Sequence, residues 1–116
     1  MDTGSWNIRT TRGIDHERTM TMSVNSLPVN LTGYTAQIQI RDGRTRADVL
    51  ILELTTENGR LTLGGALGTI TRTLTDVETD LIPQGEWWFD LILVTPTGVR
   101  ERLVKGRWGS DEPTGD

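Results

Sequence analysis

The sequence predicts an all-β protein in which two thin sheets pack face to face. Several segments alternate polar and apolar residues with the two-residue period of a strand that is buried on one side. Turn signals recur about every 8–12 residues, a spacing typical of sandwiches and barrels. The 116 residues fit one domain, and a hydrophobic share of 34% suits the thin core between two sheets.

Two strands are expected near the N-terminus. Residues 1–5 predict a flexible arm, and residues 6–11 predict a short first strand. The segment Arg12-Gly13-Ile14-Asp15 predicts a turn that ends this strand. Residues 19–24 read Thr-Met-Thr-Met-Ser-Val, and this alternation predicts a second, half-buried strand.

Four more strands are expected in the middle of the chain. Residues 34–41 form the clearest alternating segment, with apolar side chains at every second position. Residues 49–55 are a nearly continuous apolar run. The turn signal Asn58-Gly59 follows it, and two short strands are then expected at residues 60–63 and 69–74.

A single short helical turn is expected at residues 76–81. Thr75 and Glu78 have the spacing of a capping box, in which the side chain at the cap and the glutamate three residues later satisfy each other's backbone N–H groups. The segment is too short for more than a turn or two of helix.

Two long strands are expected near the C-terminus. Residues 86–95 and 99–108 are separated by the hairpin signal Pro96-Thr97-Gly98, and residues 109–116 predict a polar tail. The whole pattern predicts an immunoglobulin-like antiparallel β-sandwich of about seven or eight strands with one short helical turn, spanning residues 6–108.

Composition excludes several classes of protein. The chain has no cysteine, so neither disulfides nor thiolate metal sites can form. Its formal net charge is −4 with both signs interleaved, which argues against a nucleic-acid-binding surface. No stretch approaches the roughly 20 apolar residues that cross a membrane, and the N-terminus lacks the pattern of a signal peptide. We therefore expect no membrane partner and synthesis in the cytoplasm.

No catalytic or metal-binding set is evident in the sequence. His16 is the single histidine, and no nucleophile lies near it along the chain. The carboxylates at Asp42 and Asp48, and those between residues 76 and 80, do not match the offsets of a calcium-binding loop. The sequence therefore predicts no catalytic residue, no cofactor and no metal, and a protein that is not an enzyme.

Apolar residues that fall outside the core phase predict a partner interface. In residues 86–95, one phase carries Trp87 and Phe89 into the core, while the opposite phase also holds a tryptophan and two aliphatic residues. Tryptophan and arginine are favoured anchors of interfaces. The predicted interface residues are Trp88, Ile92, Val94, Trp6, Trp108, Arg100 and Arg102.

The last predicted strand is also rich in cations, which has two interpretations. Its basic residues are Arg100, Arg102, Lys105 and Arg107. They could contact an acidic partner. They could equally protect an exposed sheet edge, where charge blocks unwanted strand pairing. The sequence leaves both interpretations open.

Several landmarks follow one another in a familiar order. They are Arg12-Gly13-Ile14-Asp15, Leu31-Thr32-Gly33-Tyr34, Gln37-Ile38-Gln39-Ile40-Arg41, Gly68-Thr69-Ile70-Thr71, Gly85-Glu86-Trp87-Trp88-Phe89-Asp90-Leu91 and Leu103-Val104-Lys105-Gly106. In order and spacing, over residues 6–108, the chain resembles the N-terminal domain of phage upper-baseplate proteins and the short phage and prophage proteins similar to it. Two places depart from the pattern: His16-Glu17-Arg18 and Arg72 stand where small or apolar residues are usual.

The resemblance implies both a fold and a function. It implies an immunoglobulin-like sandwich that acts in the virion as an adaptor between tail or baseplate components and receptor-binding elements. The virion is expected to be assembled in the host cytoplasm. The expected partners are other virion proteins, with multiple copies around a symmetry axis. One alternative is a capsid decoration or head-fibre base. Another, from the exposed tryptophans, is a carbohydrate-binding module with a flat indole platform.

Overall fold

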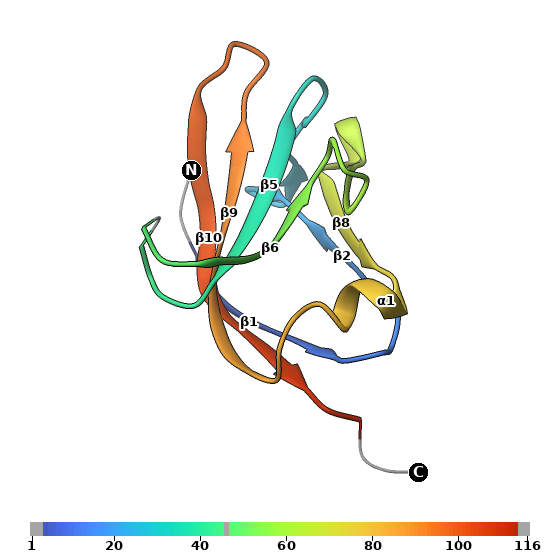
Figure 1. Cartoon of the computed structure of the whole chain (residues 1–116). Helices are drawn as coiled ribbons and strands as arrows, with labels where there is room; N and C mark the ends of the chain where they lie inside the picture. Colours follow the sequence, from blue (N-terminus) through green and yellow to red (C-terminus); the bar gives the residue numbers. More distant parts are fainter. Residues whose placement is uncertain (1–3, 46, 114–116) are drawn as a thin grey trace.

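The chain folds into two facing β-sheets (Figure 1), and the all-β sandwich predicted from the sequence is confirmed. The computed structural model describes residues 4–45 and 47–113, with side chains from Asn7 onward. The larger sheet has the order β1-β10-β9-β5-β6, and the smaller one has the order β2-β8-β7. A two-stranded hairpin, β3-β4, accompanies them.

The elements have the following bounds. The larger sheet contains β1 (Gly4–Thr11), β10 (Arg100–Asp111), β9 (Gly85–Val94), β5 (Thr35–Arg41) and β6 (Leu50–Thr55). The smaller sheet contains β2 (His16–Thr21), β8 (Thr69–Leu74) and β7 (Leu61–Leu63). The remaining elements are β3 (Ser23–Val24), β4 (Leu27–Pro28), the 3-10 turn η1 (Gly65–Leu67) and helix α1 (Asp76–Thr79).

The core lies between the two sheets. Alternate residues of β5 and β9 enter it, among them Ile38, Ile40, Phe89 and Leu91. This is the phase that the sequence predicts for both strands. The small sheet closes the core from the other side with Leu61, Ile70 and Leu74.

Strand β10 lies inside the larger sheet rather than at its edge. It pairs in parallel with β1, from Gly4 opposite Val104 to Thr11 opposite Asp111. On its other side it pairs antiparallel with β9. Both edges of β10 are paired from Val104 to Ser110, so Lys105 and Arg107 do not protect an open edge. The pairing with β1 does not extend to Arg100 and Arg102, and for these two residues both interpretations stay predictions.

Several boundaries differ from those expected, including those of β2, β10 and the N-terminal arm. Strand β2 begins at His16, because the chain from His16 to Thr21 pairs with β8 throughout. Strand β10 continues to Asp111, three residues beyond its predicted end at residue 108, because β1 pairs with it to that point. Of the predicted arm, Gly4 and Ser5 belong to β1, and residues 1–3 lie outside the described residues.

A β-bulge in β10 changes which side chains face the core. The pairing with β9 shifts register between Arg102 and Val104. Leu103 and Val104 are consecutive and both buried, at 2% and 6% exposure. A bulge inserts one extra residue, so the alternation of inward and outward side chains reverses beyond it.

The reversal corrects the predicted placement of Trp108. Trp108 has the same parity as Arg100 and Arg102, so simple alternation predicts it on their face. Beyond the bulge it turns inward and is fully buried at 0% exposure. Its indole N–H donates to Thr10 Oγ1 at 3.1 Å, and its ring meets Phe89 edge-on, with centroids 5.9 Å apart. Trp108 is a core residue and not part of a surface interface.

The chain turns sharply into β9 around Trp87. The indole N–H of Trp87 donates to the carbonyl oxygen of Pro83 at 2.8 Å. Gly85 adopts φ +146°, and a Cβ there would lie 3.1 Å from the Trp87 ring. Glycine therefore allows the indole to fold back over the corner and fix where β9 begins.

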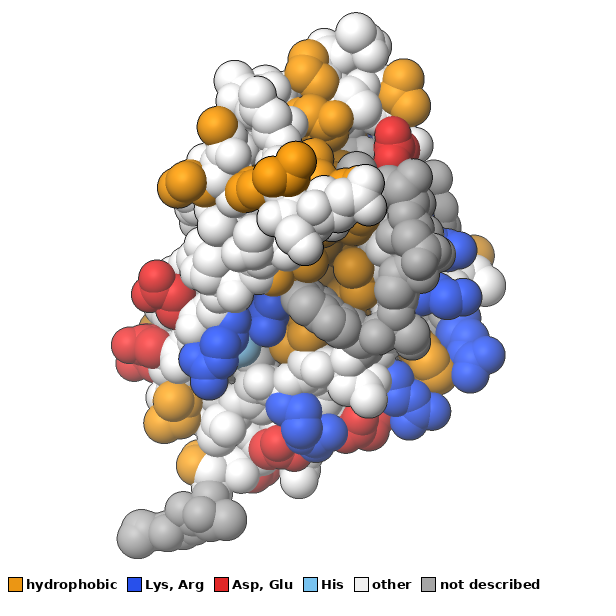
Figure 2. Space-filling model, turned by 180° about the vertical axis from the view of Figure 1, so that it is seen from behind, with side chains coloured by type: hydrophobic (Ala, Val, Ile, Leu, Met, Phe, Trp, Pro, Cys, Tyr) orange, Lys and Arg blue, Asp and Glu red, His pale blue; other side chains and the backbone are white. Residues whose placement is uncertain are grey.

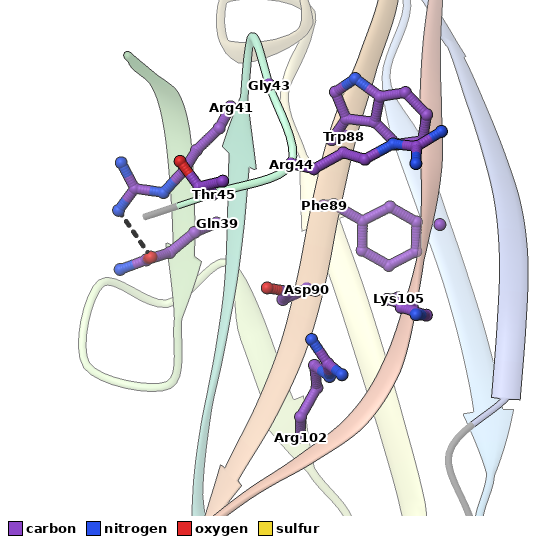
Figure 3. Close-up of a pocket in the computed structure, with 11 residues that line it drawn as sticks. Gln39, Arg41, Gly43, Arg44, Thr45, Trp88, Phe89, Asp90, Arg102 and Lys105 are labelled. Atoms are coloured by element: carbon purple, nitrogen blue, oxygen red, sulfur yellow. Dashed lines mark hydrogen bonds between the residues drawn. The ribbon is translucent and has the colours of Figure 1, made fainter. Parts of the chain in front are cut away.

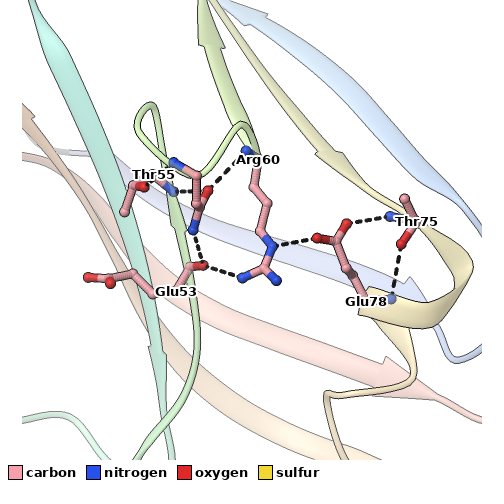
Figure 4. A network of polar contacts seen from close by, with 6 residues as sticks. Glu53, Thr55, Arg60, Thr75 and Glu78 are labelled. Carbon is pink, nitrogen blue, oxygen red and sulfur yellow. Dashed lines mark hydrogen bonds and ion pairs between the residues drawn. The ribbon is translucent and has the colours of Figure 1, made fainter.

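Helix α1 is capped as predicted, and its Glu78 side chain connects it to β6 and to the loop before β7 (Figure 4). Thr75 Oγ1 accepts from the backbone N–H of Glu78 at 3.2 Å, and a Glu78 carboxylate oxygen accepts from the N–H of Thr75 at 2.8 Å. Glu78 also receives Arg60 Nε at 2.7 Å, and the same guanidinium donates to the Glu53 carbonyl oxygen at 2.9 Å. The network joins α1 to β6 and to the loop before β7.

Candidate functional site

The outer face of the larger sheet concentrates positive charge. Six of the chain's 12 cationic residues lie on it or on the loop beside it, and we call them the basic face. The basic face consists of Arg41, Arg44, Arg100, Arg102, Lys105 and Arg107. The bulge in β10 produces this concentration, because strict alternation would have placed Arg100 and Arg102 on one side of the sheet and Lys105 and Arg107 on the other.

The cations of the basic face make no ion pair with a described residue. The ion pairs among the described residues involve Arg9, Arg12 and Arg60, none of which belongs to the basic face. Arg41 is held by the carbonyl oxygen of Asp48 and by the Gln39 side chain, both at 2.8 Å. The protein carries a formal charge of −4, so this face opposes the sign of the whole.

Trp88 lies at one end of the basic face, beside three of its arginines. In the sheet it stands directly opposite Arg107 on β10 and Arg41 on β5. The guanidinium carbon of Arg44 lies 4.2 Å from the centroid of the indole, and that of Arg107 lies 4.6 Å from it. At these distances each arginine makes a cation–π contact. Figure 3 shows the Arg44 side chain lying across the ring.

A pocket of about 320 Å³ opens beside Trp88 (Figure 3). Its wall combines the loop after β5, which carries Arg44 and Thr45, with Asp90 of β9 and Arg102 and Lys105 of β10. Among the described residues that line it, Asp90 is the only acidic one, and it stands directly opposite Lys105 in the sheet.

The structure brings together five of the seven predicted interface residues. Trp88, Ile92 and Val94 are half-buried on the outer face of β9, and Arg100 and Arg102 are exposed on the same face of β10. Trp108 lies in the core instead. Trp6 belongs to β1, opposite Gly106, but its side chain lies outside the described residues.

Sequence reasoning missed part of the site. Lys105 and Arg107 were recognised as basic but not assigned to the interface, because the bulge that aligns them with Arg102 has no clear signature in the sequence. Arg41 falls in the polar phase of its strand, and only the pairing of β5 with β9 places it beside Trp88. The position of Arg44 over the indole depends on the loop conformation, for which the sequence offers no signal.

The single histidine lies away from this face. His16 is buried in the sandwich, at 8% exposure, and its ring centroid is 6.2 Å from that of Trp108. Its Nε2 accepts from Arg72 Nε at 3.2 Å. Burial, followed by the positive charges of Arg72 and Arg18, lowers the pKa of His16 to about 4. His16 and Arg72, which both stand where the resembled pattern has small or apolar residues, thus contact each other in the fold.

In the described part of the chain, no three metal-ligating side chains gather. Its helical segments are all too short and polar to span a bilayer. Seen from behind (Figure 2), the lower half of the molecule carries side chains of both signs, with the histidine among cations, and hydrophobic side chains gather toward the top.

The fold and the site define an immunoglobulin-like domain with a cationic outer face. The N-terminal strand runs parallel to the last strand in a five-stranded sheet, a three-stranded sheet faces it, and Trp87 makes the corner hydrogen bond that a tyrosine makes in many such domains. No protein-family model matches the chain, and no curated protein matches it.

One solved structure shows the same fold. The chain matches one from the crystal structure of ICOS in complex with ICOS-L and an anti ICOS-L VNAR domain, with a TM-score of 0.51 and 11% identity over 96% of this chain and 56% of that chain. It thus spans just over half the length of that chain. Parallel homodimer structures of the extracellular domains of the sodium channel β4 subunit match with a TM-score of 0.41 and 11% identity, over 94% of this chain and 92% of that one. A structure from photo-crosslinking analyses of sodium channel β subunits gives a TM-score of 0.43 and 12% identity, over 96% and 93%.

The match to the ICOS structure contradicts the predicted function. The chain was expected to be a bacteriophage tail or baseplate adaptor, or a capsid decoration or head-fibre base. The structure matched with a TM-score of 0.51 contains immunoglobulin-like domains and no virion component. The resemblance to the phage family and the virion localisation stay predictions.

The described positions of Trp88 and Trp108 argue against the carbohydrate-binding alternative. It required a flat, accessible indole platform. Trp108 is in the core, and the guanidinium groups of Arg44 and Arg107 lie over the Trp88 ring. The two indoles therefore do not form a platform on which a sugar could stack.

Proposed function

We propose that this domain binds another protein through the outer face of its five-stranded sheet. One observation carries the proposal: a bulge, a half-buried tryptophan and six cations without ion pairs among the described residues coincide on one face. Tryptophan and arginine are the residues most enriched at the energetic centres of protein interfaces. The matched ICOS structure, a complex with ICOS-L, supports protein binding by domains of this fold.

The role that we propose is binding and not catalysis. The histidine, the residue most often used as a general base, is buried in the core and accepts a hydrogen bond from Arg72. The polar side chains that line the pocket are four cations, the amide of Gln39, the hydroxyl of Thr45 and the carboxylate of Asp90. These groups suit recognition of a charged partner.

The charge of the face favours a partner that differs from this chain. Symmetric pairing of two copies through the basic face would bring six cations of one copy against six of the other. Like charges placed together across an interface cost several kcal/mol. We therefore propose a heterologous partner.

The proposal is tested by selecting ligands from a random peptide library displayed against the immobilised domain. Selected peptides are titrated into ¹⁵N-labelled protein. We expect chemical-shift changes confined to β5, β9 and β10. Shifts confined to the smaller sheet, or no selected ligand, would contradict the proposal.

Two variants with the same charge change sharpen the test. Ile92→Glu lies on the outer face of β9, and Thr62→Glu lies exposed on β7 of the smaller sheet. We expect Ile92→Glu to weaken peptide binding at least about tenfold, as loss of an interface anchor does, and Thr62→Glu to leave it unchanged. Circular dichroism checks that both variants are folded. If Ile92→Glu does not fold, the chemical-shift changes in the unaltered protein decide whether the peptide binds the outer face.

A further inference from the structure

The pocket beside Trp88 has an excess of uncommitted positive charge. Its described lining residues include four cations, namely Arg41, Arg44, Arg102 and Lys105, and one carboxylate, that of Asp90. The Arg41 guanidinium is already engaged by Gln39 and by the Asp48 carbonyl oxygen. The other three make no ion pair with a described residue. The wall therefore offers more donors than Asp90 can satisfy.

The size of the pocket limits its occupant. A volume of about 320 Å³ is at the small end of ligand sites, which suits one or two side chains of a larger molecule. Arginine binds a carboxylate through two parallel hydrogen bonds, and such charge-assisted bonds are about twice as strong as neutral ones.

We propose that this pocket receives the carboxylate of an aspartate or glutamate from an extended segment of the partner protein. The inference rests on the proposed function and names the chemistry of its partner. Arg102 and Lys105 pair with the carboxylate, while Arg44, held over Trp88, closes the loop side of the pocket (Figure 3).

The residues that follow Asp90 along β9 favour a partner segment in which apolar residues accompany the acidic one. Ile92 and Val94 follow Asp90 at two-residue intervals on the outer face of β9, and both are half-buried. An extended chain repeats its side chains on one side about every 6.5–7 Å, the same interval. A segment that lies along β9 therefore sets an acidic residue in the pocket and apolar residues, two and four positions away, over Ile92 and Val94.

The charge of the whole domain favours a protein segment over a nucleic acid. A long polyanion would lie against the basic face and also against a protein of formal charge −4. A single carboxylate interacts only with charges within a Debye length, about 8 Å at physiological salt. The local excess of cations in the pocket is therefore sufficient to attract a single carboxylate, despite the negative charge of the whole domain.

The test uses the peptides that the library selection maps to the larger sheet. Each acidic residue is replaced in turn by glutamine, and binding is measured by calorimetry. We expect one such replacement to weaken binding about tenfold, as loss of a charge-assisted bidentate contact does. The double variant Arg102→Gln/Lys105→Gln should remove this preference, while Arg100→Gln, on the same strand face but outside the pocket, keeps it.

The outcomes separate the two proposals. Peptides that map to the face but bind equally well with glutamine overturn the acidic pocket and leave the proposed function intact. Failure to select any peptide overturns the proposed function. A ten-nucleotide oligothymidylate that binds as tightly as the acidic peptide, with the same dependence on Arg102 and Lys105, overturns the choice of a protein partner.

Discussion

Leu103 and Val104 are neighbours in the middle of a β-strand, and both side chains are buried in the core. In a regular strand one of the two would face outward. The extra residue at the bulge therefore separates β10 into two halves of opposite phase. Its first half presents Arg100 and Arg102, and its second half presents Lys105 and Arg107, on one face.

Alanine substitution at both positions tests the bulge. We expect Leu103→Ala to lower the free energy of unfolding by about 2–4 kcal/mol and Val104→Ala by about 1–3 kcal/mol, because each removes buried methyl groups. Urea denaturation measures both. The exposed neighbour provides the control, since Arg102→Ala should change the value by less than about 0.5 kcal/mol. A near-neutral result at either Leu103 or Val104 would show regular alternation instead.

The hydrogen bond between Trp108 and Thr10 joins β10 to β1 inside the core. Thr10→Val removes the acceptor and leaves the indole N–H buried without this partner. We expect a loss of about 1–3 kcal/mol in urea denaturation. Thr62→Val, at an exposed position of β7, is the matched control and should be nearly neutral. Adding Trp108→Phe completes a double-mutant cycle, in which strictly additive losses would exclude the bond.

The buried histidine makes stability depend on pH in a defined window. The pKa of His16 is lowered from 6.5 to about 4 in the folded state, so the unfolded chain binds the proton more readily. Stability is therefore complete above about pH 6.5 and falls by up to about 3 kcal/mol as the pH drops to about 4. His16→Gln keeps a hydrogen-bond acceptor and should flatten the profile between pH 7 and pH 5, where few carboxylates titrate. Parallel profiles for the two proteins would contradict the assignment.

The Arg60–Glu78 contact should stabilise the fold at pH values at which the Glu78 carboxylate is ionised. Hydrogen bonding from the Thr75 backbone, followed by that from Arg60, lowers the pKa of Glu78 in the folded state. Its stabilisation is present above the ordinary carboxylate range and is lost as the pH falls through the lowered pKa. We expect Glu78→Gln, which can still cap α1, to cost about 1 kcal/mol at pH 7, and Glu78→Ala to cost about 1–2 kcal/mol because the cap is lost as well.

Glu57→Gln is the control for that comparison, since Glu57 is exposed and outside the network. Thermal unfolding at pH 7 and pH 3 gives the required values. The difference between the wild-type protein and Glu78→Gln should shrink at pH 3. An equal difference at both pH values would mean that the charge of Glu78 contributes nothing.

The sequence predicted the strands well because their patterns are local. Phe89, Leu91 and Leu93 enter the core in the predicted phase, and Thr75 and Glu78 form the predicted capping box. Each of these features depends on residues a few positions apart. Alternation and capping can therefore be predicted from the sequence without knowing how the strands pair.

The site could be predicted only in part because it depends on pairing between distant segments. Trp88 was recognised from its phase alone, but Arg41 reaches it across the β5–β9 pairing. Trp108 was misplaced because a single extra residue reversed the phase before it. Adjacent apolar residues at Leu103 and Val104 are the only trace of the bulge in the sequence, and the same pair occurs in strands that have none.

The parallel pairing of β1 with β10 also decides how the domain would respond to mechanical load. The chain enters at Gly4, at one end of this strand pair, and leaves beyond Asp111 at the other (Figure 1). Tension between the two ends therefore pulls the strands past each other along their length. The hydrogen bonds between them lie across the direction of pull and resist it together instead of opening one after another. A domain in which the first and last strands pair in this way resists stretching in shear.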